Sequence, residues 1–258
     1  MFEHIFGTHE YNNAIVHHHS TELVVLAIII SLLGCYASLE LISRAVSSNF
    51  VKNKIMWLTA ASLCMGGCAI WAMHFIAMIA FEEGIDIKYD ALITLWSLLI
   101  AVFVTGLGFF IMAFSDRSWL KIIVTGIIMG LGIAWMHYMG MNAMIMKADM
   151  YFQPDLYYLS YAIAIGASIA ALWLCFNTKG LWQKYGSALL MTTAVCAMHF
   201  TGMRAAIIVP NADKILDRTA YAFDKLDFST YIIIAVIITL FIMVVLSLSD
   251  IGEREEEN

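Results

Sequence analysis

Three copies of one short pattern contain the side chains of this sequence that are best suited to metal chemistry. Each copy reads Met-His-aromatic-x-small-Met, and its histidine is His74, His137 or His199. The histidines are 63 and 62 residues apart, a period that fits one two-helix hairpin per repeat. Successive copies then return to the same end of the fold, so we expect the three imidazoles to lie at one depth and to share one partner.

A methionine follows each histidine by four residues, at Met78, Met141 and Met203. Four residues of an α-helix rise about 6 Å and turn about 400°, so imidazole and thioether share one face. Imidazole suits copper, zinc and iron, whereas a thioether selects soft Cu(I). The pattern therefore favours a copper site. Zinc is the main competitor, because three-histidine zinc sites are common, and a haem pocket or a metal-free histidine cluster stays open.

Several other residues near the motifs are candidates for accessory roles. The methionine before each histidine is rotated by about 100° and is expected to pack between helices. Cys196 shares a face with His199, Asp90 could cap a helix or orient a histidine, and Arg204 could tune the site or reach water. The run from 17 to 19 is all histidine and could deliver metal. The accessory set is Met73, Met136, Met198, Cys196, Asp90 and Arg204.

The elements that carry these motifs are strongly apolar. Of the 258 residues 62% are hydrophobic and 13% charged, whereas soluble domains are about 45–50% apolar and about 25% charged. A soluble globular enzyme is excluded, and the net charge of −6 without a basic stripe argues against nucleic acid. Seven apolar runs are long enough to cross a bilayer. They cover about 22–43, 55–80, 91–114, 119–146, 156–176, 185–209 and 229–249.

The expected fold is thus an all-α integral membrane protein with seven transmembrane helices. Three two-helix repeats would place the motif on helices 2, 4 and 6. Residues 1–20 form an outer segment, 21–249 the membrane domain and 250–258 an acidic cytoplasmic tail. Lysine and arginine concentrate in the loops after the first, third and fifth runs, which places the N-terminus outside and the C-terminus in the cytoplasm. These basic residues are Arg44, Lys52, Lys54, Arg117, Lys121, Lys179 and Lys184.

The repeated motif resembles that of the MHYT domain family. The copies here read Met-His-Phe-Ile, Met-His-Tyr-Met and Met-His-Phe-Thr, so none is literal, but the likeness extends from about Thr21 to Leu248. The resemblance implies a sensory domain of the bacterial inner membrane that binds copper and, through it, oxygen, carbon monoxide or nitric oxide. Family members often carry cyclic-di-GMP enzymes after this domain. None follows here, so signalling would pass through a partner protein or the rest of a longer chain.

Two other functions compete with a non-enzymatic sensor. A zinc hydrolase would use the histidines to activate water, but it needs a nearby base. The closest carboxylates, Glu82, Glu83 and Asp90, stand at the rim of the spans. A copper carrier or channel would need successive weak sites along a path, whereas the three motifs are expected at a single depth.

Overall fold

The computed structural model describes residues 18–82, 84–216 and 221–256. Most of this part is helical. Three of its helices, α2, the π-helix η1 and α3, follow one another without a break and form one rod. The helices are α1 (Thr21–Ser47), α2 (Val51–Ser62), η1 (Leu63–Ala72), α3 (Met73–Ile79), α4 (Ala91–Phe114), α5 (Trp119–Asn142), α6 (Pro154–Asn177), α7 (Leu181–Ala205) and α8 (Lys225–Glu256).

Five of these helical segments are long and apolar enough to cross a membrane. They are α1, the α2–η1–α3 rod, α4, α5 and α6, with mean hydropathies between 1.7 and 2.4. Large apolar side chains point outward from them, for example Leu92, Trp96 and Phe103, which are 61%, 54% and 68% exposed. A bilayer is the solvent that suits such a surface. The protein is therefore a membrane protein built from helices.

Helix ends follow from local side-chain chemistry. Asp90 accepts a hydrogen bond from the backbone N–H of Ile93 at 2.9 Å and so caps the start of α4. Pro154 opens α6, where its missing N–H costs nothing. At the start of α7, Gln183 accepts from the N–H of Gly180 at 3.3 Å. The last helix continues to Glu256, beyond the apolar run expected to end near 249.

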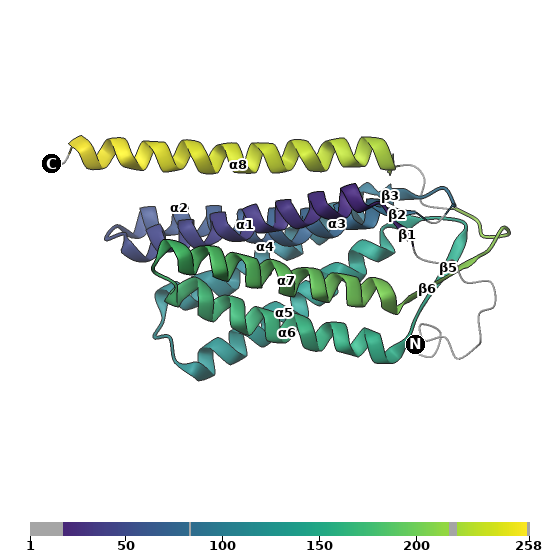
Figure 1. Ribbon diagram of the computed structural model, residues 1–258, viewed down its shortest axis with the longest axis horizontal. Coiled ribbons are helices and arrows are strands. Elements are labelled where there is room, and N and C mark those ends of the chain that lie inside the picture. Colours follow the sequence, from purple (N-terminus) through teal and green to yellow (C-terminus); the bar gives the residue numbers. More distant parts are fainter. Residues whose placement is uncertain (1–17, 83, 217–220, 257–258) are drawn as a thin grey trace.

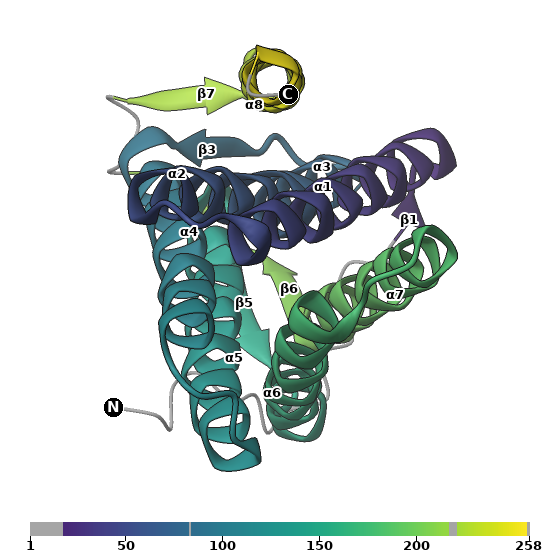
Figure 2. The same cartoon turned by 90° about the vertical axis from the view of Figure 1, so that its left-hand side faces the viewer.

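Six helical rods pack into a closed ring, and α8 lies outside it. Around the ring α1 contacts the α2–η1–α3 rod, then α4, α5, α6 and α7 follow in order, and α7 returns to α1. Seen end-on, the rods outline a triangle whose sides are α1 with α2 and α3, α4 with α5, and α6 with α7 (Figure 2). Helix α8 packs on η1 and α3, along one side of the triangle.

Short strands tie the loops together at one end of the bundle (Figure 1). They were not predicted from the sequence. The ends of the apolar runs near 146 and 209 lie in strands β4 and β6 instead of helix. The antiparallel pairs are β1 (His18–His19) with β2 (Phe81–Glu82), β3 (Lys88–Asp90) with both β4 (Met144–Ile145) and β7 (Ala222–Asp224), and β5 (Ala148–Phe152) with β6 (Ala206–Pro210).

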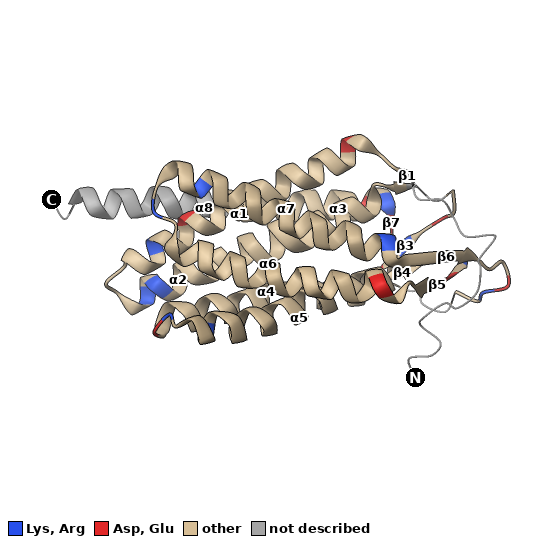
Figure 3. Cartoon of the chain, turned by 60° about the horizontal axis from the view of Figure 1, so that its bottom comes forward, with Lys and Arg blue, Asp and Glu red and all other residues tan. Residues whose placement is uncertain are grey.

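Charged residues gather at the two ends of the bundle and leave its middle bare (Figure 3). At the end away from the strands, Glu40 joins two helices. It pairs with Arg44 of its own helix at 3.6 Å and with Lys184 of α7 at 2.7 Å. Arg44 stands four residues after Glu40, a spacing that brings two helix residues to one face, whereas the contact with Lys184 joins distant helices and leaves no local pattern.

Candidate metal centre

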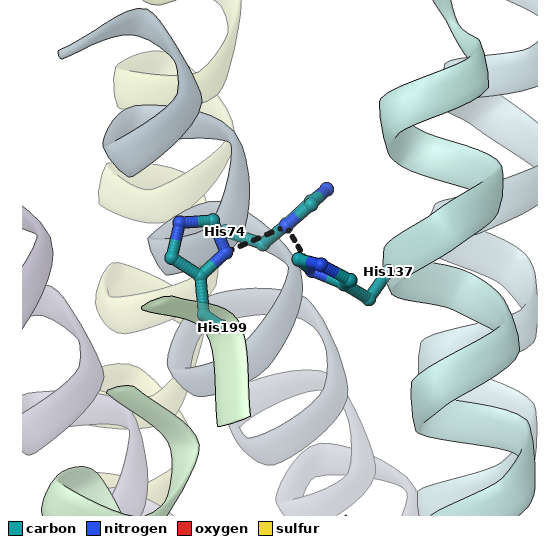
Figure 4. Close-up of side chains that lie close together, drawn as sticks. All are labelled: His74, His137 and His199. Carbon is teal, nitrogen blue, oxygen red and sulfur yellow. Dashed lines mark hydrogen bonds between the residues drawn. The ribbon is translucent and has the colours of Figure 1, made fainter. Parts of the chain in front are cut away.

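The three motif histidines converge inside the bundle. Nδ1 of His74 lies 3.0 Å from Nδ1 of His199 and 3.1 Å from Nδ1 of His137. The side chains come from α3, α5 and α7 and point toward one another (Figure 4). All three are buried, with at most 1% of their surface exposed. Each therefore offers a nitrogen to one shared, water-excluded point.

The nitrogens of this cluster have no hydrogen-bond partner outside the cluster among the described residues. A neutral imidazole has one donor and one acceptor nitrogen, and both need partners when buried. The three Nδ1 atoms face only one another, and no Nε2 atom has a hydrogen-bond partner among the described residues. One proton can be shared between neighbouring Nδ1 atoms, but three lone pairs in contact repel. A cation at the centre would use all three lone pairs.

Two of the donor separations are close to those around a bound metal ion, and one ring nitrogen of each histidine lies within 4.8 Å of the others. Nitrogens bound at about 2.0–2.1 Å in trigonal or tetrahedral geometry stand about 3.3–3.6 Å apart. The observed separations of 3.0 and 3.1 Å are shorter by a few tenths of an ångström, a difference that small ring rotations remove. Among His, Cys, Asp and Glu of the described residues, these three histidines are the one group able to share an ion.

Glycines on α5 and α7 make room for the imidazoles. A Cβ atom on Gly140 would stand 2.3 Å from Nε2 of His74, and one on Gly202 would stand 2.3 Å from Nε2 of His137. Each glycine lies three residues after the motif histidine of its own helix. This is the small position of the repeated motif. In the structure their role is to accept the histidine ring of another helix.

The aromatic residue of each motif restrains its own histidine. Phe75, Tyr138 and Phe200 meet the preceding imidazole edge-on, with ring centroids 4.7, 4.9 and 5.0 Å apart and interplanar angles of 73°, 82° and 76°. Three alike contacts explain why an aromatic ring follows every histidine. Edge-to-face packing of this kind holds a ring in one orientation.

The motif methionines are buried as well. Those four residues after the histidines lie one turn farther toward the strands, and those before the histidines lie beside them. All six are at most 3% exposed: Met73, Met78, Met136, Met141, Met198 and Met203.

The remaining predicted accessory residues lie outside the cluster. Asp90 is the cap of α4. Cys196 is a half-buried free thiol, and the other four cysteines are free and buried. Arg204 is exposed. Glu83, a candidate base for a hydrolase, lies outside the described residues, as does His17.

A fourth histidine lies near the cluster on the strand side. His19 belongs to β1, and its ring lies 5.4 Å from Phe81 and 5.9 Å from Phe200, which contacts His199. The pairing of β1 with β2 places it there. The histidine run before the first helix hinted at this position, but its distance from the motif could not be read from the sequence.

The fold and the cluster define a class: a membrane-type helical bundle with a buried tri-histidine centre. The family described as "Bacterial signalling protein N terminal repeat" (MHYT) matches residues 67–126 and 130–188. His74 and His137 each stand seven residues after the start of a matched repeat. The chain belongs to this MHYT family. The third motif, at His199, lies beyond the matched ranges, yet its imidazole joins the same cluster.

Similar proteins are bacterial signalling proteins. The chain is 38% identical over 79% of its length to the cyclic di-GMP phosphodiesterase NbdA of Pseudomonas aeruginosa, covering 26% of that protein. It is 35% identical over 71% of its length to the bifunctional diguanylate cyclase/cyclic di-GMP phosphodiesterase MucR of the same organism, covering 27%. It is 30% identical over 73% of its length to the signalling protein YkoW of Bacillus subtilis, covering 24% of that protein.

The chain thus spans about a quarter of the length of the curated relatives it matches. No solved structure matches it.

Proposed function

We propose that this chain is a sensory membrane module that binds one copper ion through Nδ1 of His74, His137 and His199. One observation carries the proposal. Three buried imidazoles aim Nδ1 at one point, where among the described residues these nitrogens meet only one another. Buried lone pairs without a partner are costly in a membrane interior, and a cation at this point would be a common partner for the three Nδ1 atoms.

Copper is the preferred ion because of the residues that surround the donors. Soft thioethers favour Cu(I) over harder ions, and six buried methionines flank the histidines. Met78, Met141 and Met203 share a helix face with their histidines and could supply a further ligand. Zinc remains the chemical alternative. It would support hydrolysis only with a base beside it, and no carboxylate of the described residues joins the cluster.

The module is proposed to cross the bacterial inner membrane seven times, with α7 and α8 as the two further spans. The helix pairs α1 with the α2–η1–α3 rod, α4 with α5, and α6 with α7 would be three repeats about a pseudo-threefold axis. The strand end would face outward, because the opposite end carries Lys184, Arg44 and most basic loop residues.

Sensing would use the position on the metal that the three histidines leave open. A diatomic gas bound there, or the metal itself, would favour one packing of the helices over another. The curated relatives carry names of cyclic di-GMP enzymes, so the proposed output is a cyclic di-GMP enzyme, in the same polypeptide or in a cytoplasmic partner.

Metal analysis of protein purified without a His tag tests the proposal. We expect about one copper per chain in the wild type and none above background in a triple variant with His74→Ala, His137→Ala and His199→Ala. A variant with His4→Ala and His9→Ala removes two histidines outside the motif and should keep the metal. Equal metal in wild type and triple variant would refute the proposal. Zinc in place of copper would refute the choice of ion.

A further inference from the structure

A small cavity lies inside the bundle directly beside the histidine cluster. Its walls come from η1, α4, α5, α6 and α7, and it has a volume of about 30 Å³. Ile70, Ile133 and Val195 line it, and each stands four residues before a motif histidine. Four residues are one helical turn on the same face, about 6 Å of rise. The cavity therefore adjoins the cluster on the side away from the strands.

The chemistry of the lining excludes water as the natural occupant. Every lining residue is apolar except Ser168, whose Oγ has no hydrogen-bond partner among the described residues. A buried water needs two to four polar partners, whereas apolar cavities in proteins stay dry and bind small apolar molecules. One hydroxyl therefore cannot hold a water here.

The size of the cavity limits the occupant to a few atoms. One water molecule needs roughly 10–15 Å³, so a volume of about 30 Å³ accepts a molecule of two or three heavy atoms. A lipid headgroup is too large and too polar. Flexible methionines, including Met191 and Met198, form part of the wall, and such side chains adapt to small ligands.

The wall between α6 and α7 gives a route from the lipid. It is formed by small residues, among them Ala164, Ala167 and Ala194. Ala167 and Ala194 are only half buried, and the cavity is partly open. Small apolar molecules dissolve better in a bilayer interior than in water, so the membrane is the natural source of such a ligand.

We propose that this cavity is a binding site for an apolar molecule of two or three heavy atoms, which reaches it from the bilayer between α6 and α7. The site does not depend on a metal in the cluster. With a metal bound as proposed above, the ligand would lie about one helical turn from the three histidines that would hold the metal.

Xenon is the probe, because it is apolar, monatomic and of suitable size. We expect saturable xenon binding to metal-free protein in lipid nanodiscs, measured by ¹²⁹Xe exchange NMR. Ala194→Leu should fill the cavity and weaken binding at least tenfold. Ala197→Leu is the matched control, since it makes the same change one turn away on an exposed position of α7 and should bind like the wild type.

A second pair of variants, on α6, keeps the test valid if one of the α7 variants misfolds. Ala167→Leu fills the cavity from α6, and Ala170→Leu changes an exposed position of the same helix. Binding lost in both filled variants and kept in both controls supports the site. No xenon binding by the wild type, as would result if a lipid chain already filled the cavity, overturns the proposal. Unchanged binding in both filled variants overturns it as well.

Discussion

The ring of Phe75 stands edge-on against the ring of Phe228, with centroids 5.1 Å apart and planes at 85°. Phe75 directly follows His74, and Phe228 belongs to the first turn of α8, outside the helical ring. Phe228 also contacts Tyr89 at 4.6 Å and is 2% exposed. The rings of His74, Phe75 and Phe228 thus lie in contact one after another, from the histidine cluster to the last helix, and we expect a change at His74 to reach α8 along this row.

Removal of this contact is expected to uncouple α8 from the metal site. With a spin label at residue 230, we expect metal removal to change the label's mobility in the wild type but not in Phe228→Ala. Metal content should stay the same, because Phe228 is not a ligand. Ile234→Ala, at a position of α8 that is 47% exposed, should behave like the wild type. A metal response that survives in Phe228→Ala would rule out this route.

Methyl groups at the two cluster glycines are expected to weaken metal binding strongly. In Gly140→Ala or Gly202→Ala the new Cβ would overlap a histidine Nε2, at 2.3 Å in either case, so the ring must turn out of place. We expect at least a tenfold loss of metal affinity, measured by competition with a chelator.

The control is Gly166→Ala, whose Cβ would meet nothing within 4 Å. It should bind metal normally and be slightly more stable, by about 0.5–1 kcal/mol, because alanine favours helix. Normal metal affinity in both Gly140→Ala and Gly202→Ala would contradict the prediction, because it would show that the imidazoles can bind metal from another position.

His19→Ala is expected to slow metal loading without changing the final stoichiometry. His19 lies beside Phe200 on the strand side of the cluster, where a metal ion arriving from outside would pass it, but it is not part of the group that can share the ion. Rapid mixing of the metal-free protein with Cu(I) would give the rate. Ser20→Ala is the neighbouring control. A stoichiometry that falls with His19→Ala would instead make His19 a ligand.

Acid should loosen the β5–β6 pair at the strand end. The pKa of Asp149 is lowered because its carboxylate accepts from the Asn211 amide at 2.8 Å and pairs with Lys214 at 3.3 Å. A carboxylate whose pKa is lowered in the folded state stabilises the fold at pH values above its unfolded-state pKa. This stabilisation is lost as the pH falls through the folded-state pKa. The wild-type melting temperature should thus fall between about pH 5 and pH 3 more than that of Asp149→Asn. The effect should be small, because Asp149 is partly exposed; parallel curves would contradict it.

The sequence predicted the positions of the helices and the identity of the clustered histidines. Long apolar runs locate helices, and a repeated interval between His74, His137 and His199 brings them to the same end of the bundle. The strands were not predicted, because each is only two to five residues long. Their pairing also joins segments far apart in the chain, for example at Lys88 and Asp224. The place of His19 depends on those strands and was missed for the same reason.

The π-helix η1 was not predicted from the sequence either, and we expect it to make the chain tolerant of length changes at this place. A π turn closes its hydrogen bond one residue later than an α turn, so η1 (Leu63–Ala72) holds surplus residues just before His74. Loss of one residue there could be absorbed by winding into ordinary helix, with His74 still directed at its partners. The same deletion in α5 would swing His137 by about 100°. Insertions and deletions among natural variants should therefore collect in the first motif rod and be absent from the other two.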